Sequence, residues 1–491
     1  MIDKSIWKAL YDTPYTDEIA LTLGDKTVSY SQLKSQIMLF SDKLSAVGIK
    51  KGDVVTISLP NVIESIIAFY GVNARGGIAN MVHPSLPNFT LRSIQENTHS
   101  KLLIGLPSHQ SIGLKITCIT DKTEVTGWDN FMKTPSVSTT YEESNGICAY
   151  LHSGGTTDKP KTIVLSSKNL NALARDLEKI FKKDECIGYK CLTTLPLFHA
   201  FGLGAGIHAL LLLGANLVLV PKFDRSVTPN LIVDENINII LGVPLIYQSI
   251  LNNQRVNKAH DLSHIKYCFV GGDFVTDELV NSINKLFLDR LSTCRLCVGY
   301  GLTECVSVVT VNTPTHYKLG SIGKPLYSIE VGIFKDNAFI SSNEIGEICV
   351  SGDTVMIRYL TGRNRCFFEH GGKRWLRTGD YGYIDQDGYY YFADRKKRIA
   401  KINGVTVFPS EVENLLSSYH GILSSYVKLG KNRKLVAYVV KAPNIQIDEG
   451  DIKNYLKSHI MKWAIPEKVI FIDSMPLTPI GKIDINSEIF N

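Results

Sequence analysis

The sequence lacks any run of eighteen apolar residues, and this absence excludes a helix that crosses a membrane. Residues 1–8 carry no positive region followed by a long apolar one, so we expect no secretory leader. Together these two absences predict a cytoplasmic protein without a membrane span.

Concentrated basic charge is also missing from this chain. Lysine and arginine number 53 against 47 aspartates and glutamates, a net charge of +6. A dedicated nucleic-acid binder carries a denser basic surface, so we expect no nucleic-acid partner. The mild positive charge is compatible with small anionic substrates.

Cysteines are present but not arranged for metal binding. The ten cysteines are scattered singly, except for the Cys-x-x-Cys pair at Cys294 and Cys297. No second Cys/His pair stands near enough to complete a zinc site. We interpret the pair as small buried side chains in reducing surroundings and assign it no chemistry.

The chain does contain enough hydrophobic residues to form large buried cores. Its 491 residues exceed one ordinary domain, and 44% of them are hydrophobic. Near the N-terminus, residues 54–59 form a compact β-branched run, and helical spacing is clear at Leu33, Ile37, Phe40 and Leu44. Similar short apolar runs, separated by amphipathic stretches, continue downstream. They predict large α/β layers with mostly parallel sheets.

The pattern changes in the last third of the chain. Beyond about residue 325 short β-rich runs with tight glycine turns predict a smaller, distorted β subdomain. The charge run 394–398 is the best linker, because a dense charge run cannot be core and because it separates two patterns. We therefore predict an N-terminal domain over residues 1–396 and a small C-terminal domain over residues 397–491.

The predicted C-terminal domain has an α+β pattern. Ser410-x-x-Glu413 has the form of a capping box before an apolar helix. Residues 434–440 and 469–472 resemble strands, and residues 450–462 resemble a helix.

A loop rich in glycine and threonine lies between two apolar runs. Residues 153–162 are Ser-Gly-Gly-Thr-Thr-Asp-Lys-Pro-Lys-Thr. Small residues let backbone N–H groups turn toward a polyanion, threonine hydroxyls can donate to phosphate oxygens, and Lys161 adds a charge. The order is wrong for a Walker A loop, and no Gly-x-Gly-x-x-Gly turn is present. The loop predicts phosphate binding, with an ordinary surface turn as the alternative.

This loop resembles the signature Thr-Ser-Gly-Thr-Thr-Gly-x-Pro-Lys-Gly of the acyl-adenylate-forming superfamily, which includes the acyl- and aryl-CoA synthetases. Other blocks similar to that superfamily follow in its order and run to the end of the chain. They are Leu-Pro-Leu-Phe-His at 195–199, Val-Gly-Gly-Asp at 270–273, Tyr-Gly-Leu-Thr-Glu at 300–304, Trp-Leu-Arg-Thr-Gly-Asp at 375–380, Asp394-Arg395 with Lys401-x-x-Gly404, and Pro476-x-Thr-x-x-Gly481-Lys482.

The resemblance implies activation of a carboxylic acid with ATP and Mg²⁺. A carboxylate must approach the α-phosphate, so positive groups and hydrogen-bond donors have to gather there. The catalytic residues implied are Thr303 at the α-phosphate, Glu304 as the Mg²⁺ ligand, Lys482 between carboxylate and α-phosphate, and His199 as a gate of the acyl pocket.

The remaining residues implied by the resemblance bind the nucleotide. The β- and γ-phosphates are assigned to Ser153, Gly154, Gly155, Thr156, Thr157 and Lys161. Adenine and ribose are assigned to Gly271, Gly272, Asp273, Tyr300, Gly301, Asp380 and Arg395. Lys401 belongs to the hinge block, and the resemblance implies that the C-terminal domain is mobile and swivels there between two reaction steps.

Several of these residues have ordinary structural alternatives. Glu304 could be a solvated carboxylate, Asp380 could cap a turn, and His199 could be a core histidine. The charge run 395–398 could be a solvated face. At the level of sequence these alternatives stay open.

Four positions depart from the superfamily pattern. Asp158 and Thr162 replace glycines of the loop, Asp394 replaces a glycine before the hinge arginine, and Arg358 replaces a glycine before a tyrosine. An aspartate beside a triphosphate would repel it unless the side chain faces solvent or pairs with a lysine. We expect Asp158 to face outward and the other changes to be mild.

One sequence feature narrows the class of carboxylic acid that this protein is expected to activate. Amino-acid-activating relatives carry an aspartate in a Phe-Asp block near the position of His199, and here residues 198–202 are Phe-His-Ala-Phe-Gly. Without a replacement acid, a fatty or aryl acid lacking an α-amino group is favoured. The mostly apolar pocket is expected from His199, residues 242–244, Gly272, residues 298–302 and Cys305.

The leading hypothesis is a two-step ligation that uses ATP, Mg²⁺ and coenzyme A. Acid and ATP give acyl-AMP and pyrophosphate, and coenzyme A then attacks to give the thioester. One alternative is loading of the acyl group onto the phosphopantetheine of an acyl carrier protein. Another is a degenerate, non-catalytic nucleotide-binding protein.

Overall fold

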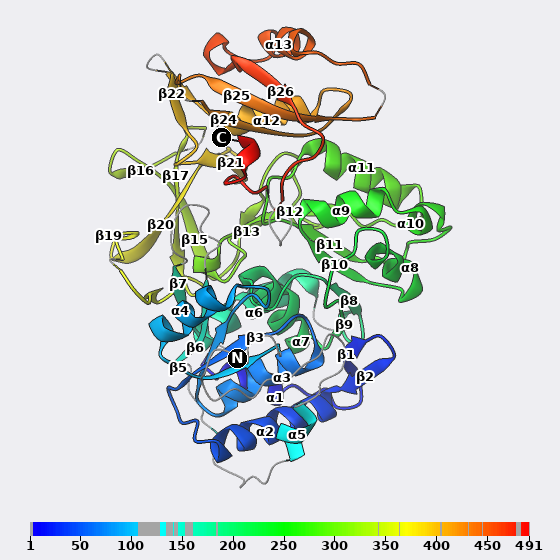
Figure 1. Cartoon of the computed structure of the whole chain (residues 1–491), viewed down its shortest axis with the longest axis vertical. Coiled ribbons are helices and arrows are strands. Elements are labelled where there is room, and N and C mark those ends of the chain that lie inside the picture. The colour runs from blue at the N-terminus through cyan, green and yellow to red at the C-terminus, as the bar shows by residue number, and fades with distance from the viewer. Residues whose placement is uncertain are drawn as a thin grey trace.

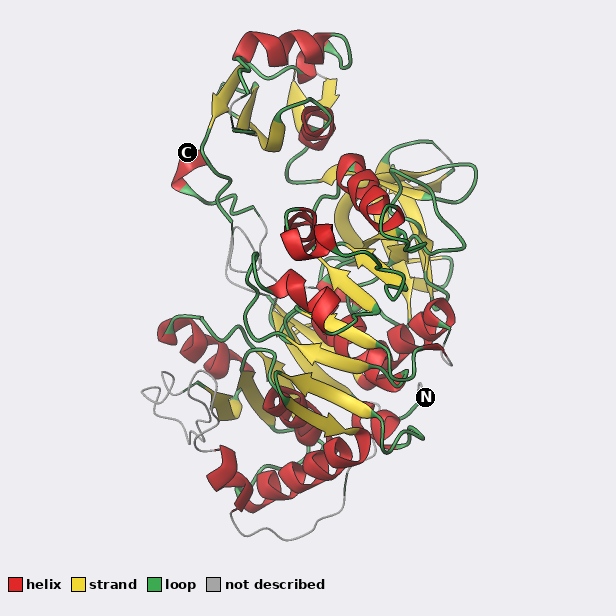
Figure 2. Cartoon of the chain, turned by 90° about the vertical axis from the view of Figure 1, so that its right-hand side faces the viewer, coloured by secondary structure: helices red, strands yellow, loops and turns green. Residues whose placement is uncertain are grey.

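The computed structural model describes residues 3–106, 128–133, 141, 146–152, 161–182, 185–341, 343–362, 364–402, 405–430, 432–443, 445–477 and 483–490. The chain is elongated, with its C-terminal part (orange to red) at one end of the long axis and its N-terminal part (blue) at the other (Figure 1). Helices lie on both faces of stacked strands (Figure 2), so the predicted α/β layers are confirmed.

The first sheet has six strands and is mostly parallel. In order across the sheet they are β18 (Arg358–Tyr359), β7 (Thr162–Ser166), β6 (Ile147–His152), β4 (Ile78–Met81), β3 (Val54–Ser58) and β5 (Ser100–Gly105). The strands β3 to β6 run parallel, whereas β7 and β18 are added antiparallel at one edge. Every residue of β3 is buried, as expected of a strand covered on both faces, and the strand predicted at 54–59 is confirmed.

The second sheet has nine strands. In order they are β14 (Lys324–Pro325), β13 (Thr310–Val311), β12 (Leu296–Tyr300), β11 (Tyr267–Val270), β10 (Ile239–Gly242), β8 (Lys190–Thr193), β9 (Asn216–Leu219), β1 (Ile19–Leu23) and β2 (Lys26–Ser29). From β12 across to β1 the neighbours are parallel. Their carboxyl ends therefore share one edge, which is where open α/β sheets bind ligands.

The helices cover these two sheets. The N-terminal ones are α1 (Ile6–Tyr11), α2 (Tyr30–Ala46), α3 (Ile63–Ala74), α4 (Asn88–Thr98), α5 (Trp128–Lys133) and α6 (Ser167–Phe181). They are followed by the π-helix η3 (Phe201–Ala209), α7 (Leu210–Leu212), the 3₁₀ helix η4 (Thr228–Asn230), α8 (Leu231–Asp234), α9 (Pro244–Leu251), α10 (Gln254–Lys258) and α11 (Asp277–Leu288). The helix predicted from the spacing of its apolar residues is α2. Leu33, Ile37, Phe40 and Leu44 are buried on one face of it.

The predicted change to β structure is confirmed. The third sheet runs β16 (Ala338–Ile340), β15 (Ile329–Lys335), β17 (Gly346–Gly352), β20 (Lys373–Ile384) and β19 (Phe367–His370), and β21 (Tyr390–Arg395) also pairs with β20. All of these pairings are antiparallel. The long strand β20 carries residues to the cleft described below.

The C-terminal unit has its own core. Its elements are β22 (Ala400–Ile402), β23 (Val405–Val407), α12 (Pro409–Ser417), β24 (Ile422–Leu429), β25 (Leu435–Lys441), α13 (Glu449–Lys457), η6 (Lys462–Ala464), β26 (Lys468–Phe471) and η7 (Glu488–Phe490). Buried residues between Ala400 and Val469 pack together separately from the main core. The two strands and the helix predicted after residue 434 are confirmed as β25, α13 and β26.

The capping box predicted at Ser410 and Glu413 is wrong. Helix α12 begins at Pro409, a residue whose fixed φ suits the first helical turn. Glu413 accepts hydrogen bonds from the Arg398 guanidinium at 2.6 Å and from the backbone N–H of Val427 at 2.7 Å. Burial raises the pKa of Glu413 to about 7, although Arg398 opposes that shift.

The expectation that the charge run at 394–398 cannot be core is wrong for Asp394. This carboxylate is fully buried and accepts from the backbone N–H groups of Arg395 at 2.7 Å and Ser410 at 3.0 Å. Arg398 Nε lies 3.6 Å from it. Because Asp394 belongs to β21 and Ser410 to α12, this departure from glycine adds a buried contact across the predicted linker. The division between residues 396 and 397 stays a prediction.

None of the described helices is both long and apolar enough to cross a membrane.

Candidate active site

A cleft of about 2300 Å³ lies at the carboxyl edge of the nine-stranded sheet. Residues that directly follow β10, β11 and β12 line one side of it, and residues of β20, β21 and the C-terminal unit line the other. The residues predicted from the sequence that line it are His199, Gly271, Gly272, Asp273, Tyr300, Gly301, Thr303, Glu304, Asp380 and Arg395. The fold thus brings together segments that lie far apart in the chain.

A tyrosine, a carboxylate and an arginine meet in this cleft. Tyr300, the last residue of β12, donates its hydroxyl to Asp380 Oδ2 at 2.7 Å. Arg395 Nε lies 3.7 Å from the other oxygen, Oδ1. Asp380 and Arg395 are cross-strand partners on β20 and β21, so the sheet register sets this pairing.

The Asp380 carboxylate is held in a desolvated position. Burial raises its pKa, while Arg395 and Tyr300 act in the opposite direction. Burial also raises the pKa of Tyr300 well above its ordinary value, so its hydroxyl is a donor at neutral pH. The backbone N–H of Asp380 donates to Thr378 Oγ1 at 3.0 Å, so a threonine side chain holds the backbone at this point of β20.

Glu304 lies on the short 3₁₀ helix η5 (Thr303–Cys305), directly after the Tyr-Gly-Leu segment. Its Oε1 accepts from the hydroxyl of Tyr359 on β18 at 2.7 Å. Its backbone carbonyl accepts from the N–H of Met356 at 2.7 Å. Within the described residues no donor contacts Oε2, and this oxygen belongs to a residue that lines the cleft.

Two glycines of the cleft are required by its geometry. A Cβ on Gly301 would lie 1.1 Å from the carbonyl oxygen of Ser307, so the backbone passes too closely for any side chain. Gly272 has a φ of +81°, in the region that favours glycine. The cleft wall at these two positions therefore depends on glycine.

Another part of the cleft lining, near the start of η3, is apolar and aromatic. His199 accepts from the backbone N–H of Phe201 through Nδ1 at 3.3 Å, at the start of η3. The rings of Phe198 and His83 have centroids 4.6 Å apart, and burial lowers the pKa of His83. His83 was not predicted from the sequence, because it lies in no recognisable motif.

Two family models match long stretches of the chain. The model described as AMP-binding enzyme matches residues 8–360, and the model described as AMP-binding enzyme C-terminal domain matches residues 411–482. The chain belongs to the AMP-binding enzyme family. The resemblance noted from the motifs is therefore confirmed.

Relatives of this AMP-binding enzyme include named CoA ligases. A 4-coumarate–CoA ligase 3 from Arabidopsis thaliana is 28% identical over 501 residues, which cover 95% of this chain and 87% of that protein. A long-chain-fatty-acid–CoA ligase from Bacillus subtilis is 26% identical over 537 residues, which cover 98% of this chain and 93% of that protein.

Solved structures share the fold over nearly the full length. O-succinylbenzoate coenzyme A synthetase from Bacillus subtilis, in complex with AMP, superposes with a TM-score of 0.83 at 26% identity, covering 99% of this chain and 98% of that one. ATP-bound MatB from Rhodopseudomonas palustris superposes with a TM-score of 0.89 at 21% identity, covering 99% of both chains.

Sequence reasoning also missed a polar chain that crosses the first sheet beneath the cleft of this AMP-binding enzyme. His152 Nε2 lies 2.7 Å from Asn80 Oδ1, and Asn80 Nδ2 donates to Thr56 Oγ1 at 2.9 Å. His152 Nδ1 lies 3.2 Å from Thr162 Oγ1, and burial lowers the pKa of His152 to about 4. The neutral ring thus joins the end of β6 to the start of β7. Thr162, which replaces a glycine of the superfamily's loop, therefore has a hydrogen-bonding partner in His152.

Some predicted residues cannot be placed in the cleft. Residues 153–157 of the phosphate loop, Asp158, Gly404 and Lys482 lie outside the described residues. Lys401 is exposed on β22 and is not one of the described residues that line the cleft. Lys161 contacts the Tyr359 ring, with Nζ 4.9 Å from the ring centroid.

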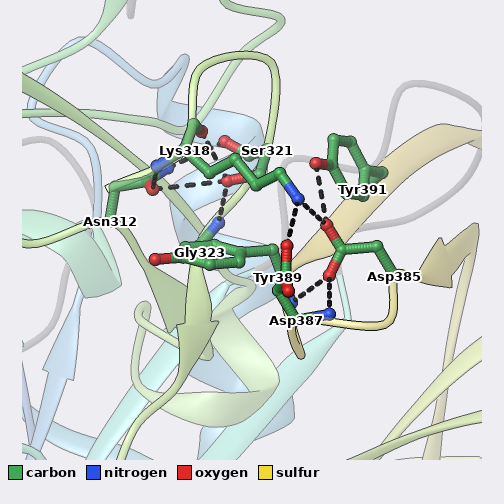
Figure 3. Close-up of polar contacts among 8 residues, drawn as sticks. All are labelled: Asn312, Lys318, Ser321, Gly323, Asp385, Asp387, Tyr389 and Tyr391. Atoms are coloured by element: carbon green, nitrogen blue, oxygen red, sulfur yellow. Dashed lines mark hydrogen bonds and ion pairs between the residues drawn. The ribbon is translucent and has the colours of Figure 1, made fainter. Parts of the chain in front are cut away.

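A charged cluster supports one wall of the cleft from behind. Lys318 Nζ donates to Asp385 at 2.6 Å and to Asp387 at 2.8 Å, and Tyr391 donates to Asp385 at 3.1 Å (Figure 3). The backbone of Lys318 is held by Asn312 Oδ1 at 2.9 Å. This cluster fixes the segment between β13 and β14, whose residues 320–322 line the cleft.

Lowering the pH from about 4 to about 2 is expected to weaken the ion pairs of this cluster. Burial acts against the charge, but donors led by Lys318 lower the pKa of Asp385 to about 2. A carboxylate with a depressed pKa contributes stability above its unfolded value near 4, and loses it as pH falls toward 2. Asp385→Asn should therefore lower the thermal midpoint at pH 6, and the gap to the parent protein should narrow between pH 4 and pH 3. A constant gap over that range would contradict the assignment.

Proposed function

We propose that this protein activates a carboxylic acid lacking an α-amino group with ATP, releasing pyrophosphate, and then transfers the acyl group to coenzyme A. The observation that carries the proposal is the meeting of Tyr300, Asp380, Arg395 and Glu304 in one cleft. The named CoA ligases among its relatives support the same reaction class.

The buried carboxylate suits the sugar of a nucleotide. Asp380 is only 8% exposed, and its two oxygens can accept from two neighbouring ribose hydroxyls. Arg395 at 3.7 Å balances the negative charge that burial would otherwise disfavour. Tyr300 lines the same cleft as Gly271 and Gly272, and its aromatic face offers a flat surface for a purine base.

The carboxylate of Glu304 fits a Mg²⁺ ion that also binds substrate phosphates. Mg²⁺ is commonly held by one or two carboxylates together with substrate phosphates and water. Tyr359 binds only Oε1 of Glu304, so Oε2 can serve as the ligand. The ion would neutralise phosphate charge when bound. Among the described residues no group of three or more potential ligands forms a metal site without the nucleotide.

Glu304→Gln is expected to raise the Mg²⁺ concentration for half-maximal activity by at least about fivefold, because a neutral amide oxygen is a poorer ligand for a hard dication. The measurement is ATP–pyrophosphate exchange over a Mg²⁺ series at saturating ATP. Glu344→Gln, a surface carboxylate paired with Lys335, is the matched control. An unchanged Mg²⁺ curve in the Glu304 variant would rule out the metal role.

The acid is proposed to bind in the apolar part of the cleft. This part is lined by Phe198, Phe201, Ala205, Leu241 and Phe269. An apolar lining favours the body of a fatty or aryl acid, since burial of such surface stabilises binding. The proposed carboxylate end would point toward Thr303 and Glu304, where the chemistry takes place.

The second step is proposed to use coenzyme A as the acyl acceptor. Residues 397–491 would swivel between the steps, with Lys482 serving the first and the hinge block that contains Lys401 serving the second. The relatives named above are CoA ligases, which favours coenzyme A over a carrier protein as the acceptor.

The deciding experiment combines pyrophosphate exchange with product analysis. Exchange is measured with a panel of aryl acids, fatty acids of increasing length and amino acids, and thioester formation is then tested with coenzyme A and with a phosphopantetheinyl carrier protein. Exchange with an aryl or fatty acid and a thioester of coenzyme A is the expected result. Exchange with no acid would point to a non-catalytic nucleotide-binding protein, and a thioester on the carrier protein alone would identify a different acceptor.

A further inference from the structure

Tyr359 contacts two oppositely charged groups at once. Its hydroxyl donates to Glu304 Oε1 at 2.7 Å, and Lys161 Nζ lies 4.9 Å from the centroid of its ring. Tyr359 is not one of the described residues that line the cleft, whereas Glu304 is. The tyrosine therefore reaches Glu304 from behind.

The backbone fixes Tyr359 between these two groups. The segment from Met356 to Leu360 is hydrogen-bonded to the Glu304 carbonyl at one end, through the Met356 N–H at 2.7 Å. At the other end the Leu360 N–H donates to the Thr162 carbonyl at 2.8 Å, one residue after Lys161. The segment thus spans from the carboxylate to the lysine.

Side chains hold the backbone of Tyr359 itself. Its N–H donates to Asn364 Oδ1 at 2.7 Å. Its carbonyl accepts from Arg358 Nη1 at 3.2 Å, and the same nitrogen donates to the Leu360 carbonyl at 3.1 Å. Arg358, a departure from the superfamily's glycine, therefore stabilises the strand that carries the tyrosine.

We propose that Tyr359 is a positioning residue, which orients the Glu304 carboxylate for Mg²⁺ through its hydroxyl and keeps Lys161 apart from that carboxylate through its ring. The proposal rests on the proposed function, since Glu304 is the proposed metal ligand. A hydrogen bond to Oε1 leaves Oε2 directed to the metal and limits rotation of the carboxylate. The ring lies between its contact with Lys161 Nζ, at 4.9 Å from the centroid, and its hydroxyl bond to Glu304. If the ring were removed, the positive charge of the lysine would compete with the dication for this carboxylate.

Two substitutions separate the two parts of this role. Tyr359→Phe keeps the ring for Lys161 and removes only the hydroxyl donor. Tyr359→Leu removes both. The control is Tyr141→Phe, which deletes a tyrosine hydroxyl bonded to the carboxylate of Asp42, and neither of these residues lines the cleft.

The readout is the dissociation constant of ATP, measured by calorimetry without Mg²⁺ and over a Mg²⁺ series, with exchange activity recorded in parallel. Tyr359→Phe is expected to raise the Mg²⁺ concentration for half-maximal tightening of ATP binding by about threefold to tenfold, the scale of the net contribution of one ordinary hydrogen bond. ATP affinity without Mg²⁺ should stay within twofold of the parent protein. Tyr141→Phe should leave the whole curve unchanged.

Tyr359→Leu is expected to shift the Mg²⁺ curve further than Tyr359→Phe, because it also removes the ring that Lys161 contacts. A Tyr359→Phe curve equal to that of the parent protein would overturn the proposal. An equal loss of ATP affinity with and without Mg²⁺ would also overturn it, because that result indicates general distortion. If the parent protein binds ATP with Mg²⁺ but exchanges pyrophosphate with no acid, the proposed function fails while the binding curves still decide the role of Tyr359.

Discussion

Gly301→Ala is expected to reduce ATP–pyrophosphate exchange by more than about a hundredfold, the scale seen when a charge-stabilising group of an active site is displaced. The new Cβ would lie 1.1 Å from the carbonyl oxygen of Ser307, which is backbone and cannot turn aside as a side chain would. The N–H of Ser307 is bonded to the Leu302 carbonyl at 3.0 Å. The turn that carries Thr303 and Glu304 must therefore move as a whole.

A matched glycine tests whether this effect is specific to that turn. Gly206→Ala places its Cβ 3.5 Å from the nearest atom, an ordinary contact, inside the π-helix η3. This variant should keep its thermal midpoint and its exchange rate within a few fold, whereas Gly301→Ala should also unfold at a lower temperature. Equal behaviour of the two variants would show that the close approach at Gly301 does not shape the site.

Lys482→Ala is expected to lower the adenylation rate by about a hundredfold or more, because one positive group near the carboxylate and α-phosphate is lost. The two half-reactions distinguish this role from a structural one. Supplied with preformed acyl-AMP, the variant should still form the thioester of coenzyme A, since the proposed swivel removes this lysine from the site before the second step. A similar loss in both half-reactions would mean that Lys482 supports the fold or acts in another way.

Much of the fold could be predicted from local patterns. The spacing of Leu33, Ile37, Phe40 and Leu44 matches the period of a helix, so α2 could be recognised from these residues alone. The continuous apolar run at 54–59 is typical of a strand covered on both faces, so β3 could be recognised in the same way. The family could also be predicted, because its motifs are contiguous and keep their order. Tyr300 and Asp380 were both predicted, and the structure adds the hydrogen bond that joins them across 80 residues of sequence.

What could not be predicted depends on contacts between distant segments. Tyr359 reaches Glu304 only because β18 is added to the edge of a sheet formed nearly 200 residues earlier. His152 meets Asn80 through strand order, which no local pattern records. The capping box at Ser410 failed because Asp394 and Arg398 take the atoms that the motif would have used.

The strand β18 also affects how the chain folds as it is synthesised. Residues 163 and 164 of β7 acquire their outer neighbours only when Tyr359 and Arg358 have been made. Likewise, β1 near the N-terminus can pair with β9 only after β9 has been synthesised, because Leu21 pairs with Leu217. Contacts of such long sequence separation slow folding, and unpaired strand edges promote association between chains. Nascent chains that end before residue 358 should therefore require a chaperone, and adding the remaining segment should relieve that requirement.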